Sequence, residues 1–126
     1  MKFEVGVDSL RRLLEIGYVA AGNGYFAEAE TIFRGVAAMR PESSAPVIGR
    51  AVSALNRGMA AEAVRLLEAE RQRSPDDALV QAFLGLALRS AGRNAESTAA
   101  LAALSDSADA VAAAMAQALL VHNSGA

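Results

Sequence analysis

Three glycines recur at a fixed interval of 34 residues, at Gly24, Gly58 and Gly92, and each begins a similar phrase. The phrases are GYFAEAETIF, GMAAEAVRLL and GRNAESTAAL. Pro41 and Pro75 repeat at the same interval. Self-similarity at one fixed period indicates an array of equal structural units, and this period is typical of a helix–turn–helix unit. We therefore expect an all-α array of stacked helix pairs.

The length of 126 residues accommodates three such units and one further helix. We predict a single domain over residues 1–126, with repeats at about 10–43, 44–77 and 78–107 and a terminal helix at 108–121. Apolar periodicity and end signals predict helices at 8–22, 25–39, 45–57, 60–73, 77–91, 94–104 and 108–121. Residues 122–126 are expected to fray.

The predicted helix ends depend on a few residue types. Each repeated glycine falls between the two helices of a unit, where a left-handed backbone conformation is needed that glycine adopts without steric cost. Each repeated proline stops a second helix, because proline cannot continue the hydrogen-bond ladder. The pairs Asp76/Asp77 and Asp106/Asp109 precede apolar runs and are therefore predicted to be helix N-caps rather than acid–base pairs.

Three further positions repeat within the units. A small residue lies in the middle of each first helix, another lies early in each second helix, and a large apolar residue follows one turn later. These residues are Gly17, Ala51 and Gly85, then Ala29, Ala63 and Ser97, then Phe33, Leu67 and Leu101. With the turn glycines and closing prolines, residues 10–109 resemble the tetratricopeptide repeat (TPR) family. The resemblance implies a TPR-like right-handed superhelix of three helix-turn-helix repeats plus a C-terminal capping helix.

Composition argues against most chemical functions. The chain has no cysteine and one histidine, which excludes thiol chemistry and multi-histidine metal sites. Its net charge of −2 gives no basic surface for nucleic acid or anionic membrane. It shows neither the apolar region of a secretory signal nor an apolar run of about 18 residues, so we expect a cytoplasmic protein. With no catalytic constellation or nucleotide motif either, we expect no enzyme, no cofactor and no metal.

The first helices are apolar on more than one side, whereas the second helices are amphipathic. A small domain cannot bury all of this apolar surface, and first helices line the concave face of a TPR array. A contiguous apolar patch usually marks a protein interface, and an amphipathic helix is the natural occupant of such a groove. The predicted groove residues are Leu14, Tyr18, Ala21, Ile48, Val52, Leu55, Leu79, Ala82, Leu86 and Arg89. Alternatively, these side chains form internal core, or the terminal helix fills the groove.

A short TPR array with an apolar groove and an extra terminal helix resembles the small TPR-like cochaperones of bacterial type III secretion. That resemblance implies a protein-binding chaperone whose partner is a small helical export or needle-type subunit, together with a second small chaperone. The alternative is a self-associating TPR scaffold, in which the apolar helices build a homodimer without a client.

Overall fold

The structure, a computed structural model, describes residues 6–124. This part of the chain consists of seven α helices joined by short turns, without a β strand. The helices are α1 (Val7–Gly22), α2 (Phe26–Met39), α3 (Ala45–Asn56), α4 (Ala60–Arg73), α5 (Ala78–Ser90), α6 (Asn94–Ala102) and α7 (Ala110–Ser124). Each helix predicted from the sequence is present, and the all-α prediction is confirmed.

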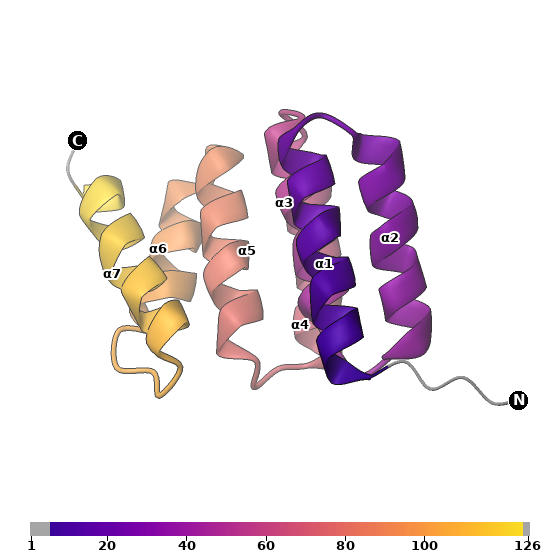
Figure 1. The fold of residues 1–126 in the computed structure, drawn as a ribbon. Helices are drawn as coiled ribbons and strands as arrows, with labels where there is room; N and C mark the ends of the chain where they lie inside the picture. The colour runs from indigo at the N-terminus through magenta and orange to yellow at the C-terminus, as the bar shows by residue number, and fades with distance from the viewer. Residues whose placement is uncertain (1–5, 125–126) are drawn as a thin grey trace, which may run out of the picture.

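The seven helices form a stacked array (Figure 1). Each helix packs against the next one in sequence, and the first helices of successive units also contact one another. Helices α1, α3, α5 and α7 therefore make one continuous row, whereas α2, α4 and α6 do not contact each other. Helix α7 packs on α5 and α6, where the first helix of a fourth unit would lie. It extends the array as a cap and does not fold back over α1 and α3.

Glycine turns and capping residues set the ends of the helices as predicted. Gly24, Gly58 and Gly92 have φ angles of +85°, +74° and +80°, in the left-handed region where a side chain would be strained. The carboxylate of Asp77 accepts hydrogen bonds from the backbone N–H groups of Leu79 and Val80, at 3.0 and 3.1 Å. Asp109 caps α7 in the same way. The first turns of α5 and α7 are therefore held by side chains of the residues that directly precede these helices.

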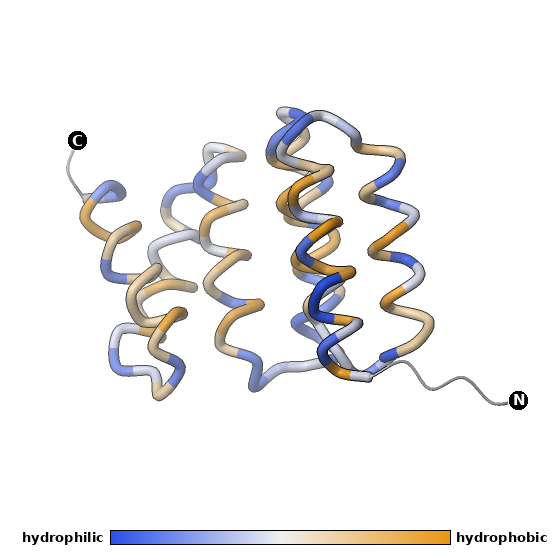
Figure 2. Tube along the Cα trace, in the orientation of Figure 1, coloured by the Kyte–Doolittle hydropathy of each residue, from blue (hydrophilic) through white to orange (hydrophobic). Residues whose placement is uncertain are grey.

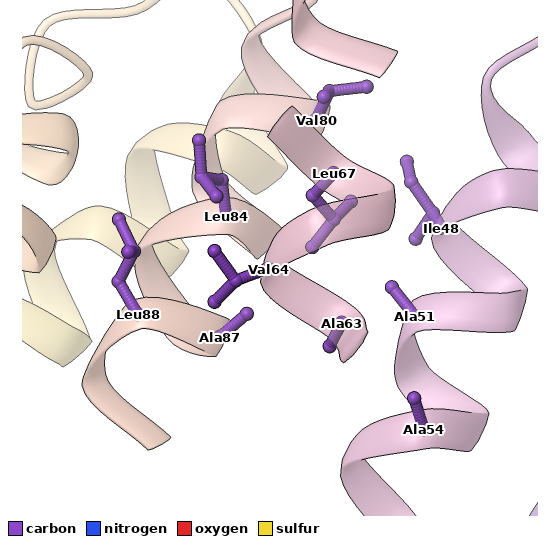
Figure 3. Close-up of a cluster of buried hydrophobic side chains, with 10 residues drawn as sticks. All are labelled: Ile48, Ala51, Ala54, Ala63, Val64, Leu67, Val80, Leu84, Ala87 and Leu88. Atoms are coloured by element: carbon purple, nitrogen blue, oxygen red, sulfur yellow. The ribbon is translucent and has the colours of Figure 1, made fainter. Parts of the chain in front are cut away.

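The largest group of buried side chains joins α3, α4 and α5. Figure 3 shows Ile48 and Ala51 of α3 lying opposite Leu67 of α4, with Leu84 and Leu88 on α5. Hydrophobic residues are distributed along α5 and α7, whereas the turns are mostly hydrophilic (Figure 2). Alanine and glycine at the helix crossings let the backbones approach closely, so this core forms with few aromatic residues.

One feature differs from the predictions, and another was not predicted. Residues 122–124 continue α7 instead of fraying, because the Asn123 side-chain amide donates to the hydroxyls of Ser97 (3.0 Å) and Thr98 (3.4 Å) on α6. Residues 125–126 lie outside the described part of the chain. Glu70, which is not among the residues considered from the sequence, is only 2% exposed although it belongs to the charged, amphipathic helix α4.

The ring of Phe33 is held between two glycines on neighbouring first helices. A Cβ atom placed on Gly17 would lie 2.7 Å from Cε1 of this ring, and one on Gly49 would lie 2.5 Å from the same atom. The ring is fully buried and cannot move away from one glycine without approaching the other helix. The small residues of α1 and α3 are thus required by one aromatic side chain of α2.

We expect Gly49→Ala to lower the free energy of unfolding, measured by urea denaturation, by about 1–2 kcal/mol. Overpacking a full core costs about 1–3 kcal/mol, which exceeds the gain of about 1 kcal/mol from replacing glycine by alanine in a helix. Gly35→Ala in α2 is the matched control, because no atom lies within 4 Å of its added Cβ. That variant should be stabilised; equal effects at both positions would contradict the packing argument.

Candidate protein-binding groove

A groove of about 560 Å³ opens along the row of first helices. Its apolar lining comes from all four of them: Tyr18 of α1, Ile48 of α3, Leu79 and Phe83 of α5, and Val111 of α7. The remaining lining residues are Glu42, Ser43, Ser44, Ala45 and Asp77, which lie at or near the N-terminal ends of α3 and α5. We call this surface the central groove.

Tyr18 forms the α1 side of the central groove. Its hydroxyl donates to the carbonyl oxygen of Ala45 at 3.3 Å, and its ring packs edge-on against Phe33 with centroids 5.4 Å apart. Burial raises the pKa of the Tyr18 hydroxyl, so the group stays neutral and remains a hydrogen-bond donor near neutral pH. Tyr18 therefore connects α1 to the start of α3 while its ring contributes to the apolar lining.

A buried polar cluster holds the loop between α2 and α3 against α4. The Ser44 hydroxyl donates to Oε2 of Glu70 at 2.6 Å, and Nη1 of Arg73 donates to Oε1 of the same carboxylate at 2.8 Å. Nη2 of Arg73 also donates to the carbonyl oxygen of Pro41 at 2.6 Å. A buried carboxylate needs such partners, since desolvating it without them would cost several kcal/mol. The cluster fixes one wall of the central groove.

Three of the ten predicted groove residues line the central groove together: Tyr18, Ile48 and Leu79. Ile48 is 4% exposed and forms part of the floor. Leu14 lies in a separate pocket between α1 and α2. The other residues do not line the groove; Val52, Leu55, Leu86 and Arg89 are half-buried on α3 and α5.

Two predicted groove residues are instead part of the core, which corrects the prediction. Ala21 is 1% exposed and packs with Ala29 and Phe33 of α2. Ala82 is fully buried and packs with Leu101 and the α7 alanines. Both alanines lie where helices approach closely, so neither offers surface to a partner.

Two apolar residues of the central groove, Phe83 and Val111, are not among the predicted groove residues. The positions one and two repeats before Phe83 are Gly49 and Glu15, so comparison between repeats does not select an aromatic residue there. Val111 was assigned to a terminal helix whose position was left open. The N-cap at Asp109 sets the start of α7, but the packing of α7 on α5 and α6, which brings Val111 to the groove, depends on contacts between units that no sequence signal marks.

The opposite side of the array carries ion pairs. Between α2 and α3, Glu30 accepts hydrogen bonds from Arg34 (2.7 Å) and Arg50 (2.9 Å). Burial raises the pKa of the Glu30 carboxyl, but these two arginines lower it by more, so the pKa lies below its usual value. Such partly exposed pairs contribute little to stability, typically below about 1 kcal/mol.

Neither a metal site nor a membrane helix is found among the described residues. Residues 6–124 contain no group of three or more His, Cys, Asp or Glu side chains placed to hold a metal ion. None of their helices is long and apolar enough to cross a membrane. The central groove offers apolar side chains, serine hydroxyls and two carboxylates, which suits the binding of a polypeptide.

Solved structures with a similar arrangement of helices include the chaperones SycD and PcrH. The translocator chaperone SycD of Yersinia enterocolitica is 14% identical with a TM-score of 0.69, covering 95% of this chain and 86% of that one. PcrH from Pseudomonas aeruginosa is 15% identical with a TM-score of 0.75, covering 95% of both chains. PcrH in complex with the chaperone binding region of PopD has a TM-score of 0.69 at 15% identity, covering 99% of this chain and 98% of that one.

At these identities the similarity shows the fold alone, and it confirms the TPR-like architecture. No curated protein sequence matches the chain significantly. A family model described as bacterial type III secretion protein (HrpB1_HrpK) matches residues 2–125. Because this match spans nearly the whole chain, the protein belongs to the HrpB1_HrpK family of bacterial type III secretion proteins.

Proposed function

We propose that this protein is a type III secretion chaperone that holds a helical segment of a small, aggregation-prone export subunit in the central groove. The observation that carries the proposal is the groove itself, in which four helices contribute apolar side chains to one continuous surface. Membership of a type III secretion family and a fold shared with SycD and PcrH support it. PcrH, whose fold is similar, is known in complex with the chaperone binding region of PopD.

The lining of the groove defines the segment that fits it. Tyr18, Leu79, Phe83 and Val111 offer an apolar surface, so the partner must present apolar side chains at helical spacing. Burying one Leu or Ile anchor contributes roughly 1.5–3 kcal/mol before ordering costs, so several anchors are needed. The carboxylates of Glu42 and Asp77 favour neutral or basic residues beside those anchors.

The same proposal includes the kind of partner and the place where binding occurs. A needle-type subunit is suitable, because a protomer that polymerises through its helices must be kept apart from other copies before export. A second small chaperone would cover the part of such a client that the groove leaves exposed. The client would be bound on the cytoplasmic side, before it enters the secretion apparatus.

The experiment is capture of the tagged protein from cytoplasmic and envelope fractions of its own host, followed by mass spectrometry of stoichiometric partners. The proposal expects a short helical export subunit in the cytoplasmic fraction, recovered at a fixed ratio with or without a second small protein. Recovery of the bait without a partner, combined with a dimeric mass by light scattering, would support the homodimeric scaffold instead. Purified bait and subunit should then form a complex that keeps the subunit soluble.

A further inference from the structure

A second, smaller pocket is lined by residues from the first half of α1, the end of α2 and the loop that follows α2. Its volume is about 290 Å³. The apolar lining consists of Val7, Leu10, Leu14 and Val36, and the polar residues of the lining are Arg11, Arg40 and Ser43. We call it the α1–α2 pocket. It has room for an apolar side chain, and its charged residues are both cationic.

Neither arginine of this pocket has an anionic partner within the described part of the chain. No carboxylate of residues 6–124 lies within ion-pair distance of Arg11 or Arg40, although five other arginines of that range are paired. The Arg40 guanidinium donates a hydrogen bond to the carbonyl oxygen of Met39, at 3.3 Å. Two unpaired cations beside an apolar cavity complement a carboxylate next to an apolar side chain.

The corresponding place in the second repeat is part of the central groove. The positions 34 residues after Arg11, Leu14 and Ser43 are Ala45, Ile48 and Asp77, which all line that groove. The positions 34 residues after Leu10 and Val36 are Ser44 and Glu70, which hydrogen-bond to each other. The α1–α2 pocket is therefore the first-repeat counterpart of the groove, but it is more apolar at these last two positions and carries arginine where the groove has alanine.

The α1–α2 pocket and the central groove share one lining residue, Ser43, so they lie next to each other on the array. Their charges are opposite, because the groove has Glu42 and Asp77 whereas the pocket has Arg11 and Arg40. A polypeptide that spans both sites and has an acidic end therefore binds in one orientation, with that end at the pocket.

We propose that the α1–α2 pocket binds an apolar side chain flanked by an acidic residue, in the same partner polypeptide that occupies the central groove. This inference rests on the proposed chaperone function. It adds a second anchoring site and a reason for the orientation of the client: the acidic end lies over Arg11 and Arg40, and the neutral or basic part lies along Glu42 and Asp77.

The test is a methyl-group NMR titration of the full-length protein with two capped tetrapeptides, Glu-Leu-Leu-Glu and Gln-Leu-Leu-Gln. We expect shifts at the methyl groups of Leu10, Leu14 and Val36, and binding of the acidic peptide about three- to tenfold tighter than that of the neutral one, as for two exposed ion pairs. The preference should disappear in the Arg11→Gln/Arg40→Gln variant. It should remain in Arg12→Gln, which removes an adjacent, exposed arginine that does not line the pocket.

Three outcomes would overturn the inference. Equal affinity for the two peptides would remove the role of the arginines. Shifts restricted to Ile48, Leu79 and Val111 would mean that only the central groove binds peptide, and the chaperone proposal would stand without the second site. Nuclear Overhauser contacts from residues 1–5 to Leu10 in the free protein, with no peptide binding, would make this chain itself the occupant. Failure to capture any client would instead count against the proposed function, whatever the peptides do.

Discussion

Phe33→Ala is expected to lower the free energy of unfolding by about 3–5 kcal/mol, the usual cost of deleting a fully buried aromatic side chain. The ring is 0% exposed and lies against the backbones of α1 and α3, so no neighbouring side chain can readily fill the space it leaves. The total free energy of unfolding of a domain of this size is about 5–15 kcal/mol, so the variant should unfold at a much lower urea concentration. Urea titration followed by far-ultraviolet circular dichroism measures the change.

Two further variants test the cause of this effect. Phe26→Ala, on the same helix, removes a ring that is half-buried and lies 5.3 Å from the Arg57 guanidinium, so it should cost much less. In the Phe33→Ala background, Gly49→Ala should no longer destabilise, because its Cβ then enters the empty space. A double-mutant cycle would show strong coupling between the two positions. Destabilisation by Gly49→Ala in both backgrounds would mean that the ring is not the obstacle.

The architecture could be predicted because each unit repeats the same turn and helix-packing residues at the same positions. A left-handed glycine between the paired helices and a proline after the second helix mark the boundaries in the sequence itself. Small residues opposite large ones, such as Gly85 opposite Leu101, mark the helix crossings. These signals are local or periodic, so they are readable without knowing how the units stack.

The groove was less predictable, because its lining depends on the rotation of each first helix. Tyr18, Ile48 and Leu79 were identified from helical spacing, but the same reasoning placed Ala82 in the groove although it faces α7. Phe83 has no counterpart in the other repeats. Where repeats diverge, side-chain placement is decided by contacts between units, and the spacing of residues within one helix does not contain that information.

Glu70 shows the same limitation in the core. Its charge favours the surface, although helical spacing from Ala63 and Leu67 places it on the buried face of α4. Burial becomes possible only because Ser44, from the preceding loop, and Arg73, one turn later, both donate to its carboxylate. A hydrogen bond between residues 26 positions apart is invisible to sequence periodicity.

Val111→Asp should weaken binding of the export subunit at least tenfold without unfolding the protein. Val111 is 60% exposed on α7, so the free protein tolerates a polar residue there, whereas a complex would cover it. Losing the burial of a valine contributes up to about 1.5–3 kcal/mol, and 1.4 kcal/mol corresponds to tenfold in affinity. The new carboxylate also joins Glu42 and Asp77 in the groove, which disfavours an apolar partner further.

Val19→Asp is the matched control for this measurement. Val19 is 62% exposed, nearly the same as Val111, but it lies on α1 outside the central groove. Calorimetric titration of the captured subunit into each variant should therefore show loss of affinity for Val111→Asp and wild-type affinity for Val19→Asp. Equal loss in both would mean that general surface hydrophobicity holds the client. Loss in Val19→Asp alone would place the binding surface on the outer side of α1, and a chaperone acting through the row of first helices would then be the wrong mechanism.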